Sequence, residues 1–375
     1  MQIKTITCHD VYNHGASLQA YALQTYLESL GHHVEIIDYK PDYLSSEYKL
    51  WVVANPVYDK PFIRLLYLMA KLPNRLYSLK RKKAFDGFTK NYLKLTNHRF
   101  ETYDQLNEAG LEADIFIAGS DQIWNTILPN GMDPAFYLDF APKTSVKLSY
   151  AASFATEDVA EEKKMFVCKM LQNFDVVSIR ERCSLPLLES LGRKDGTVVC
   201  DPVFLLPRAQ WNELLPEESI KEMYLLVYDT EQSDCLRRTA LRIAKEKNLK
   251  IYNVSAFRMG YADKNLWASS PLEFVRLIRD AKYVVSNSFH ATAFSLIFER
   301  DFCVINRSEK INERMKSLLK DLSLEKRFVT GYSDYLMGPI DYLKVRELIQ
   351  KEIDCSKDFL GKYTLGGNEK VIIGL

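Results

Sequence analysis

The feature that most constrains this chain is a regular alternation of short β-rich runs with segments of helical periodicity, which begins at the first residues. The clearest unit has a strand over Ile3–Cys8, a polar turn over His9–Gly15, a helix that stops at Gly31, and a second strand over Val34–Asp38. The apolar residues of the helix recur at helical spacing and mark one face. Strands and helices in this order form a mainly parallel sheet covered by helices, so the sequence predicts an α/β fold.

The alternation continues in two series of strands. We predict the first series to continue over Ala113–Ala118, Val146–Ala151, Val176–Ile179 and Thr197–Cys200, and the second to run over Met223–Tyr228, Lys250–Val254, Tyr283–Ser286 and Phe302–Ile305. A single hydrophobic core rarely grows beyond ~250–300 residues, and this chain has 375. We therefore expect two domains, residues 1–207 and 208–340, and then a helix and tail over 341–375 that could pack on either domain.

Composition excludes several classes of protein. Fifty Lys and Arg against forty-nine Asp and Glu give a net charge of +1, which lacks the positive field typical of a nucleic-acid binder. No apolar run approaches the ~20 residues of a membrane span, and the first residues have the pattern of a strand rather than of a signal peptide. The seven cysteines are scattered and are expected to be reduced. We therefore expect a cytoplasmic protein without a nucleic-acid partner.

The strand and helix pattern breaks down over residues 40–105, which we interpret as a mostly helical insertion in the first domain. Within it, Pro61–Leu95 carries nine Lys and Arg against the single acidic residue Asp86, interleaved with aromatic and aliphatic residues. A basic amphipathic stretch of this kind can rest on an anionic membrane leaflet. It can equally be a solvated helix whose long side chains cover apolar surface.

The most informative candidate site follows the strand Tyr283–Ser286. Asn287, Ser288 and His290 lie where that strand ends and a helix begins at Phe289, which is where doubly wound folds bind ligands. The N–H groups of a helix start favour an anion, phosphate above all. The alternative is that Ser288 only caps the helix and His290 is a packed core histidine.

Arg180 occupies a similar place at the end of the strand Val176–Ile179. An arginine there can hold a carboxylate or phosphate in two-pronged geometry. The alternative is a surface pair with Glu181, and this applies more strongly to Arg182, two residues further on.

Two more segments follow predicted strands. The first turn, Asn13–Gln19, has one glycine where the dinucleotide fingerprint needs three, and no phosphate-loop lysine follows, so an NAD or ATP site is not supported. Gly119–Asn125 combines small, acidic, amide and aromatic side chains, which suits sugar recognition. A capped helix start with Trp124 in the core explains the same residues.

The adjacent His32 and His33 lack carboxylates at ligand spacing, so no metal site is indicated.

The sequence blocks at these segments carry a family resemblance. They are NHGASLQAYAL near the start, GSDQIWN at Gly119–Asn125, SIRER at Ser178–Arg182, DPVFLL at Asp201–Leu206 and SNSFHATAFSLIF at Ser286–Phe298. In this order they resemble the polysaccharide pyruvyl transferase family, from the first strand to about residue 310. The resemblance implies two Rossmann-like domains facing a cleft, as in GT-B glycosyltransferases. It further implies that the donor substrate is phosphoenolpyruvate and that no separate cofactor is needed.

The resemblance also implies roles for particular residues. The acceptor would be two hydroxyls of a sugar in a surface polysaccharide or its lipid-linked precursor, joined to pyruvate as a ketal. His290 would be the general acid and Arg180 the donor ligand, with neighbouring donor contacts from Asn287, Ser288 and Phe289. We assign the base to Asp121 and the acceptor side to Asn13, Gly15, Gln122 and Trp124, with Trp124 as a platform for the sugar ring.

Two other functions fit the same pattern. A nucleotide-sugar glycosyltransferase would share the two domains and the phosphate site at a helix start. A non-catalytic protein of glycan assembly would keep the fold without the chemistry. The intact set of His290, Arg180 and Ser288 favours the pyruvyl transferase.

Overall fold

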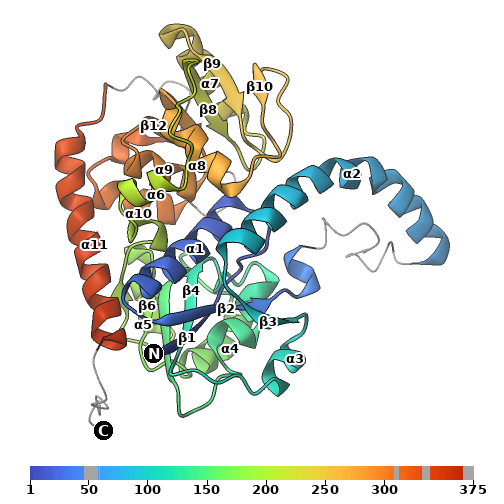
Figure 1. The fold of residues 1–375 in the computed structure, drawn as a ribbon, viewed down its shortest axis with the longest axis vertical. Coiled ribbons are helices and arrows are strands. Elements are labelled where there is room, and N and C mark those ends of the chain that lie inside the picture. The colour runs from blue at the N-terminus through green and yellow to red at the C-terminus, as the bar shows by residue number, and fades with distance from the viewer. Residues whose placement is uncertain (46–57, 59, 308–311, 332–337, 366–375) are drawn as a thin grey trace.

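Two parallel sheets form the framework of the computed structural model, which describes residues 1–45, 58, 60–307, 312–331 and 338–365 (Figure 1). The strand order is β3-β2-β1-β4-β5-β6-β7 in the first sheet and β10-β9-β8-β11-β12-β13 in the second. Every strand pair in both sheets is parallel. In each sheet the order reverses beside its first strand, which is the doubly wound arrangement of Rossmann folds.

The first sheet and its helices occupy the first 200 residues. Its elements are β1 (Gln2–Ile6), α1 (His14–Ser29), β2 (His33–Tyr39), α2 (Pro61–Tyr92), β3 (Leu95–Phe100), α3 (Tyr103–Glu108), β4 (Ile115–Asp121), β5 (Val146–Ala152), α4 (Glu161–Leu171), β6 (Ser178–Ile179), α5 (Leu185–Ser190) and β7 (Thr197–Val198). Short 3-10 turns interrupt the loops, among them η7 (Pro202–Phe204) directly after β7.

The second sheet follows a short helix. Its elements are α6 (Arg208–Glu213), β8 (Tyr224–Tyr228), α7 (Asp234–Lys247), β9 (Lys250–Asn253), β10 (Lys264–Asn265), α8 (Pro271–Asp280), β11 (Tyr283–Ser286), α9 (Phe289–Ile297), β12 (Asp301–Ile305), α10 (Glu313–Asp321), β13 (Phe328–Val329) and α11 (Tyr342–Thr364). The predicted boundary at residue 207 lies between β7 and β8.

Local sequence explains where these elements begin. The helix α1 starts after Asn13, whose Oδ1 accepts hydrogen bonds from the N–H groups of Gly15 and Ala16. The Ser270 hydroxyl caps α8 in the same way, and Pro271 occupies the first helical position. All five residues of β8 are buried, as expected of a central parallel strand covered on both faces.

The predicted strands are recovered with shifts of a few residues at their ends, but the predicted insertion is partly wrong. Residues 95–100 form β3, an edge strand of the first sheet, so the extra segment separates β2 from β3 and is shorter than 40–105. The sequence does not predict this strand, because most of its side chains are polar and only Thr96 and Phe100 are buried. Residues 46–57 of the predicted insertion lie outside the described residues.

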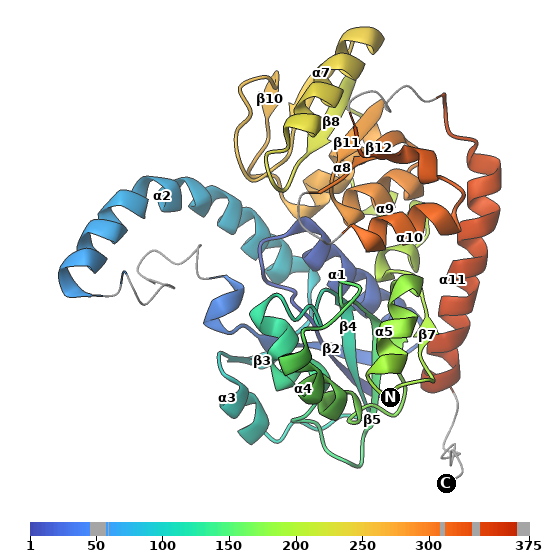
Figure 2. The ribbon, with the colours of Figure 1, turned by 180° about the vertical axis from the view of Figure 1, so that it is seen from behind.

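The last helix, α11, contacts both halves of the molecule. Val345 belongs to the core around the second sheet, whereas Phe359 and Leu360 pack with residues of the first sheet. The hydroxyl of Ser356 accepts a hydrogen bond from the N–H of Cys200. Figure 2 shows the helix running along one side of the molecule past both sheets. None of the helices in the described ranges is both long and apolar enough to cross a membrane.

Candidate active site

The carboxylate of Asp201 joins the two main predicted site residues. Nη1 of Arg180, after β6, donates to Asp201 Oδ2 at 2.7 Å, and Nε2 of His290, in the first turn of α9, lies 3.4 Å from the same oxygen. Asp201 is held by its own turn, since its Oδ1 accepts from the N–H of Val203. All three side chains are buried. The fold therefore brings residues of the two sheets together at one buried carboxylate.

Arg180 is surrounded by negative charge and by one aromatic ring. Its Nε donates to Glu181 Oε1 at 3.2 Å, and its Nη2 lies 3.7 Å from Asp121 Oδ1. The guanidinium carbon lies 4.4 Å from the centre of the Phe289 ring. Burial alone would lower the pKa of Arg180, but the carboxylates of Glu181, Asp201 and Asp121 outweigh it and raise that pKa above its ordinary value. Arg180 is thus a fixed cation, held in place from three sides.

A second buried arginine, Arg314 on α10, completes the group. Its guanidinium carbon lies 6.0 Å from the Phe289 ring centre, and its Nη1 lies 3.8 Å from Asp121 Oδ1. Burial, followed by repulsion from Arg180, lowers the pKa of Arg314 to about 10. With the Gln122 amide oriented so that its oxygen faces Arg314, both terminal nitrogens of the guanidinium donate to it, at 2.8 and 3.1 Å. Two cations therefore converge on one ring and one carboxylate.

His290 lies directly against the start of α1. A Cβ atom built on Gly15 would fall 1.9 Å from Nδ1 of His290, so only glycine leaves room for the imidazole. Asn13 is exposed and caps α1, which fixes the backbone beside the ring. The imidazole is therefore bounded by Asp201 on one side and by the α1 backbone on the other.

The charges of this site stabilise one another. Burial would raise the pKa of Asp201, but His290 and then Arg180 outweigh it and lower the pKa below its usual range. Asp201 is therefore ionised at neutral pH.

Asn287 and Ser288 have mainly structural contacts. Asn287 is buried, its Oδ1 accepts from the N–H and hydroxyl of Thr230, and its Nδ2 donates to Asp229 Oδ1 at 2.8 Å. These bonds tie the end of β11 to the end of β8. Ser288 is the N-cap residue of α9 without a side-chain capping bond, and the residue is partly exposed.

The prediction that Trp124 offers a platform to a sugar ring is wrong. The indole is fully buried, stacks on Tyr137, and donates from Nε1 to the carbonyl of Phe136 at 3.1 Å. The alternative, a core tryptophan, is what the structure has. Sequence spacing could not separate the two, because both place an aromatic residue shortly after a strand.

Sequence reasoning missed Asp201, Glu181 and Arg314 as site residues. Asp201 and Glu181 lie inside the sequence blocks DPVFLL and SIRER, which carry the family resemblance, but the sequence alone does not indicate what their side chains contact. Arg314 lies nine residues after the end of β12 and has no strand-end signal of its own. Only the packing of α10 beside α9, which places Arg314 near Phe289 at the start of α9, reveals it.

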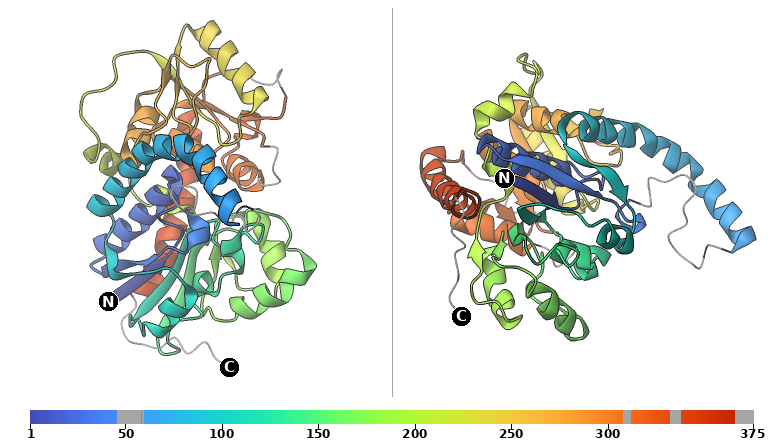
Figure 3. Two further views of the ribbon diagram at one scale, coloured as in Figure 1. Left: turned by 90° about the vertical axis from the view of Figure 1, so that its right-hand side faces the viewer. Right: turned by 60° about the horizontal axis from the view of Figure 1, so that its bottom comes forward.

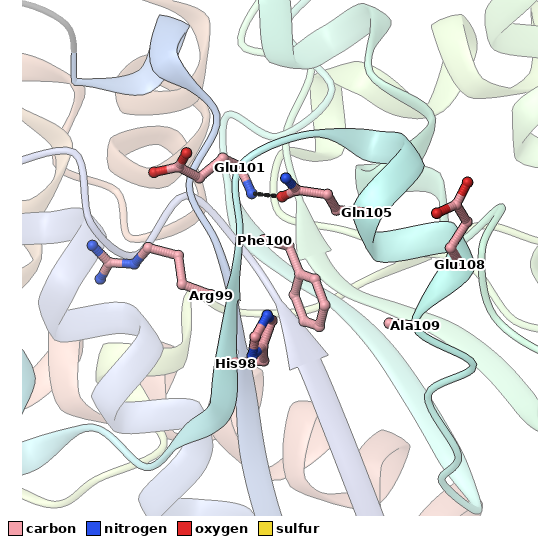
Figure 4. Close-up of a pocket in the computed structure, with 7 residues that line it drawn as sticks. All are labelled: His98, Arg99, Phe100, Glu101, Gln105, Glu108 and Ala109. Atoms are coloured by element: carbon pink, nitrogen blue, oxygen red, sulfur yellow. Dashed lines mark hydrogen bonds between the residues drawn. The ribbon is translucent and has the colours of Figure 1, made fainter.

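Other hollows in the described structure lie apart from these residues. One of about 470 Å³ is formed by β3 and α3 and is lined by polar side chains together with Phe100 and Ala109 (Figure 4). A larger one, about 600 Å³, lies along the outer face of α7 beside Leu241. A smaller one, about 250 Å³, lies beyond the carboxyl ends of β8 and β9 and includes Asp229, Arg237 and Tyr261. The described residues include no cluster of three or more His, Cys, Asp or Glu arranged to hold a metal ion.

Solved structures with the same architecture come from sugar-modifying enzymes. One assigned as a UDP-N-acetylglucosamine 2-epimerase from Listeria monocytogenes is 8% identical, covers 98% of each chain and gives a TM-score of 0.56. The S. aureus MnaA structure with UDP is 9% identical, covers 97% of this chain and 96% of its own, and gives 0.53. A comparison with curated proteins gave no significant match. The likeness defines the class of fold: a two-domain α/β protein of the GT-B type.

The sequence family is narrower than the fold. The family model described as polysaccharide pyruvyl transferase matches residues 13–309, which include Arg180, Asp201 and His290. The chain belongs to the polysaccharide pyruvyl transferase family.

Proposed function

We propose that this protein transfers the pyruvyl group of phosphoenolpyruvate to two hydroxyls of one sugar and releases inorganic phosphate. The methylene carbon gains a proton and becomes a methyl group, and the carbon that bore the phosphate forms two C–O bonds in place of one. One hydroxyl proton balances the new methyl C–H bond, and the other leaves with the phosphate. The reaction therefore needs an anion site, an acid and a base close together.

The observation that carries this proposal is the pair of buried arginines. Arg180 Nη2 and Arg314 Nε make no hydrogen bond within the described structure, although both atoms are buried. A buried N–H without a partner is costly, and a bound carboxylate or phosphate would satisfy it. Phosphoenolpyruvate carries both groups. The first turn of α9, which starts at Phe289, adds the favourable end of a helix dipole beside them.

In this proposal His290 is the general acid. Its Nε2 makes no hydrogen bond of good geometry within the described residues and lies 3.4 Å from the carboxylate of Asp201, which positions the ring. A positioned imidazolium can protonate either the methylene carbon or the departing phosphate oxygen. Asp201 acts through His290 and Arg180, so we treat it as a positioning residue.

The acceptor is the less defined part of the proposal. Asp121 remains our candidate base, because it ends β4 at the same group of charges and is partly exposed. It holds a left-handed backbone conformation, with φ of 71°, a strained geometry of the kind that clusters at functional sites. Asn13, which is exposed, and Gln122, which faces Arg314, stay predictions for acceptor contact. Gly15 lies against the imidazole of His290, so we assign it to the space around the general acid and not to contact with the acceptor.

We further propose that the reaction takes place in the cytoplasm on a surface polysaccharide or on its lipid-linked precursor. The family supports a polysaccharide acceptor. The lipid-linked form would place the enzyme near the inner leaflet.

The direct test is incubation of the purified protein with phosphoenolpyruvate and a panel of free and lipid-linked oligosaccharides. We expect mass spectrometry to detect a pyruvylated sugar and an equal amount of released phosphate. Transfer from a nucleotide sugar, with none from phosphoenolpyruvate, would overturn the proposal.

A further inference from the structure

The long helix α2 has one half packed on the body and one half that projects from it. In the packed half, Phe85 and Phe88 are buried, and Arg81 donates to the carbonyls of Tyr12 and Trp267 at 3.1 and 2.8 Å. Tyr77 stacks on Trp267, with ring centres 3.6 Å apart. The helix is thus anchored to both sheets' loops. Its first half reaches away from the body in Figure 1 and in the right-hand view of Figure 3.

The projecting half has an exposed apolar stripe. Its large exposed apolar side chains are Phe62, Ile63, Leu65, Leu66, Met69, Leu72 and Leu76. At 3.6 residues per turn all of these except Ile63 fall on one side of the helix over four turns, roughly 20 Å. Isolated exposed apolar residues are ordinary, but a continuous row of six marks a contact surface.

The helix that carries this stripe is strongly basic. Residues 60–85 contain no Asp or Glu and eight Lys and Arg: Lys60, Arg64, Lys71 and Arg75 along the projecting half, and Lys80, Arg81, Lys82 and Lys83 where the helix reaches the body. The whole chain has a net charge of only +1. Positive charge is therefore concentrated on this helix and balanced elsewhere on the molecule.

Charge decides between the two occupants that an apolar stripe could have. A second copy of this chain would bring the cations along the stripe, among them Lys60, Arg64 and Lys71, near those of its partner, and like charges across an interface oppose association. An anionic lipid surface attracts each Lys or Arg and accepts apolar side chains at the boundary between headgroups and acyl chains. We propose that the stripe formed by residues 62–76 of α2 docks the protein on the anionic cytoplasmic leaflet of a membrane. This docking does not depend on the donor chemistry proposed above.

The test of the stripe is flotation of the purified protein with vesicles of phosphatidylcholine and phosphatidylglycerol in equal parts. We expect wild type to float with these vesicles at low salt and not with pure phosphatidylcholine. Met69→Glu should abolish flotation, because it places a charge in the middle of the stripe. The matched control is Met165→Glu on α4, where the methionine is 84% exposed against 62% for Met69 and no such stripe exists. Equal loss in both variants would overturn the proposal.

The contribution of the basic residues to membrane binding is tested by reversing the charge of two lysines at once. Lys71→Glu with Lys80→Glu should weaken binding to the anionic vesicles by at least about tenfold, since each basic residue near such a surface contributes about 1 kcal/mol. Lys194→Glu with Lys221→Glu makes the same change in net charge at side chains 82% and 90% exposed elsewhere, and should leave binding nearly unchanged. Binding of wild type should disappear in ~1 M salt, where the screening length is about 3 Å.

Two results would reject the membrane as the occupant. The first is wild-type protein that stays unbound to anionic vesicles at low salt. The second is a dimer in analytical ultracentrifugation that Met69→Glu converts to monomer, because the stripe would then belong to a second copy. Thermal melting of each variant, expected to match wild type, shows that the substituted proteins are folded.

Discussion

At the scale of single residues, the carboxylate of Asp201 lies between Arg180 and His290. Loss of its charge leaves the buried guanidinium of Arg180 without one of its ion-pair partners. We expect Asp201→Asn to lower the free energy of unfolding by about 3–5 kcal/mol at pH 7, as when one member of a buried ion pair is lost. The folded-state pKa of Asp201 is lower than its unfolded value, so its contribution is complete above that value, ~3.9, and is lost as the pH falls further. Urea unfolding should therefore show a constant difference between wild type and Asp201→Asn from pH 7 to about 5. The difference should narrow below about pH 4. A difference that grows as the pH falls would contradict this account.

Gly15 gives a test of His290 that leaves the histidine in place. A Cβ at Gly15 would collide with the imidazole, so Gly15→Ala should displace the ring and reduce turnover as His290→Ala does, by ~10²–10⁴-fold. The measurement is phosphate release from phosphoenolpyruvate in the presence of acceptor. Gly87→Ala is the control, because a Cβ there meets nothing within 4 Å, and it should keep full activity. Wild-type turnover in Gly15→Ala would show that the position of His290 does not matter for the reaction.

Arg180 and Arg182 form a matched pair for the donor site. Arg180 is buried among carboxylates, whereas Arg182 is half exposed near Asp321 and Glu352. Arg180→Lys should weaken phosphoenolpyruvate binding about tenfold or more, because lysine cannot reproduce a two-pronged contact with an anion. Arg182→Lys should leave it unchanged, as calorimetric titration can show. Equal donor affinity in wild type and Arg180→Lys would remove Arg180 from the site.

At the scale of elements, α11 holds the first sheet's core with its last turns. Leu360 is fully buried there, and Leu343 near the start of the same helix is exposed. Leu360→Ala should cost about 2–5 kcal/mol of unfolding free energy in denaturant titration, and Leu343→Ala should cost less than about 0.5 kcal/mol. Similar values for the two would mean that the end of α11 is not part of the core.

The elements that the sequence predicted are those whose apolar pattern is set by burial on both faces. Strands such as β8 and β11 are continuous apolar runs, so they and the residues that follow them, including His290, could be located in advance. Arg180 follows the two-residue strand β6, which was also found from its apolar run. In contrast, β3 is an edge strand with three exposed residues in its middle, and its pattern resembles a loop. Arg314 could not be predicted, because it enters the site through the packing of α10, and Trp124 was ambiguous because core and platform tryptophans share one pattern.

At the scale of the whole molecule, the site exists only because two sheets meet. Arg180, Glu181, Asp201 and Asp121 come from the first sheet, and Phe289, His290 and Arg314 come from the second. The two halves also share one continuous core, to which α1, α6, α8 and α9 all contribute. A ligand that bridges the arginines of both halves should therefore stabilise the fold as a unit.

The measurement that tests the central claim most directly is thermal unfolding with candidate donors. A ligand bound only to the folded state adds ~2.7 kcal/mol at 100 times its dissociation constant, which raises the melting midpoint by several degrees. We expect phosphoenolpyruvate to raise it, inorganic phosphate to raise it less, and UDP-N-acetylglucosamine to leave it unchanged. His290→Ala should keep part of the shift, because Arg180 and Arg314 still hold the anion, and Arg180→Lys should lose most of it. A clear shift with the nucleotide sugar and none with phosphoenolpyruvate would contradict the account.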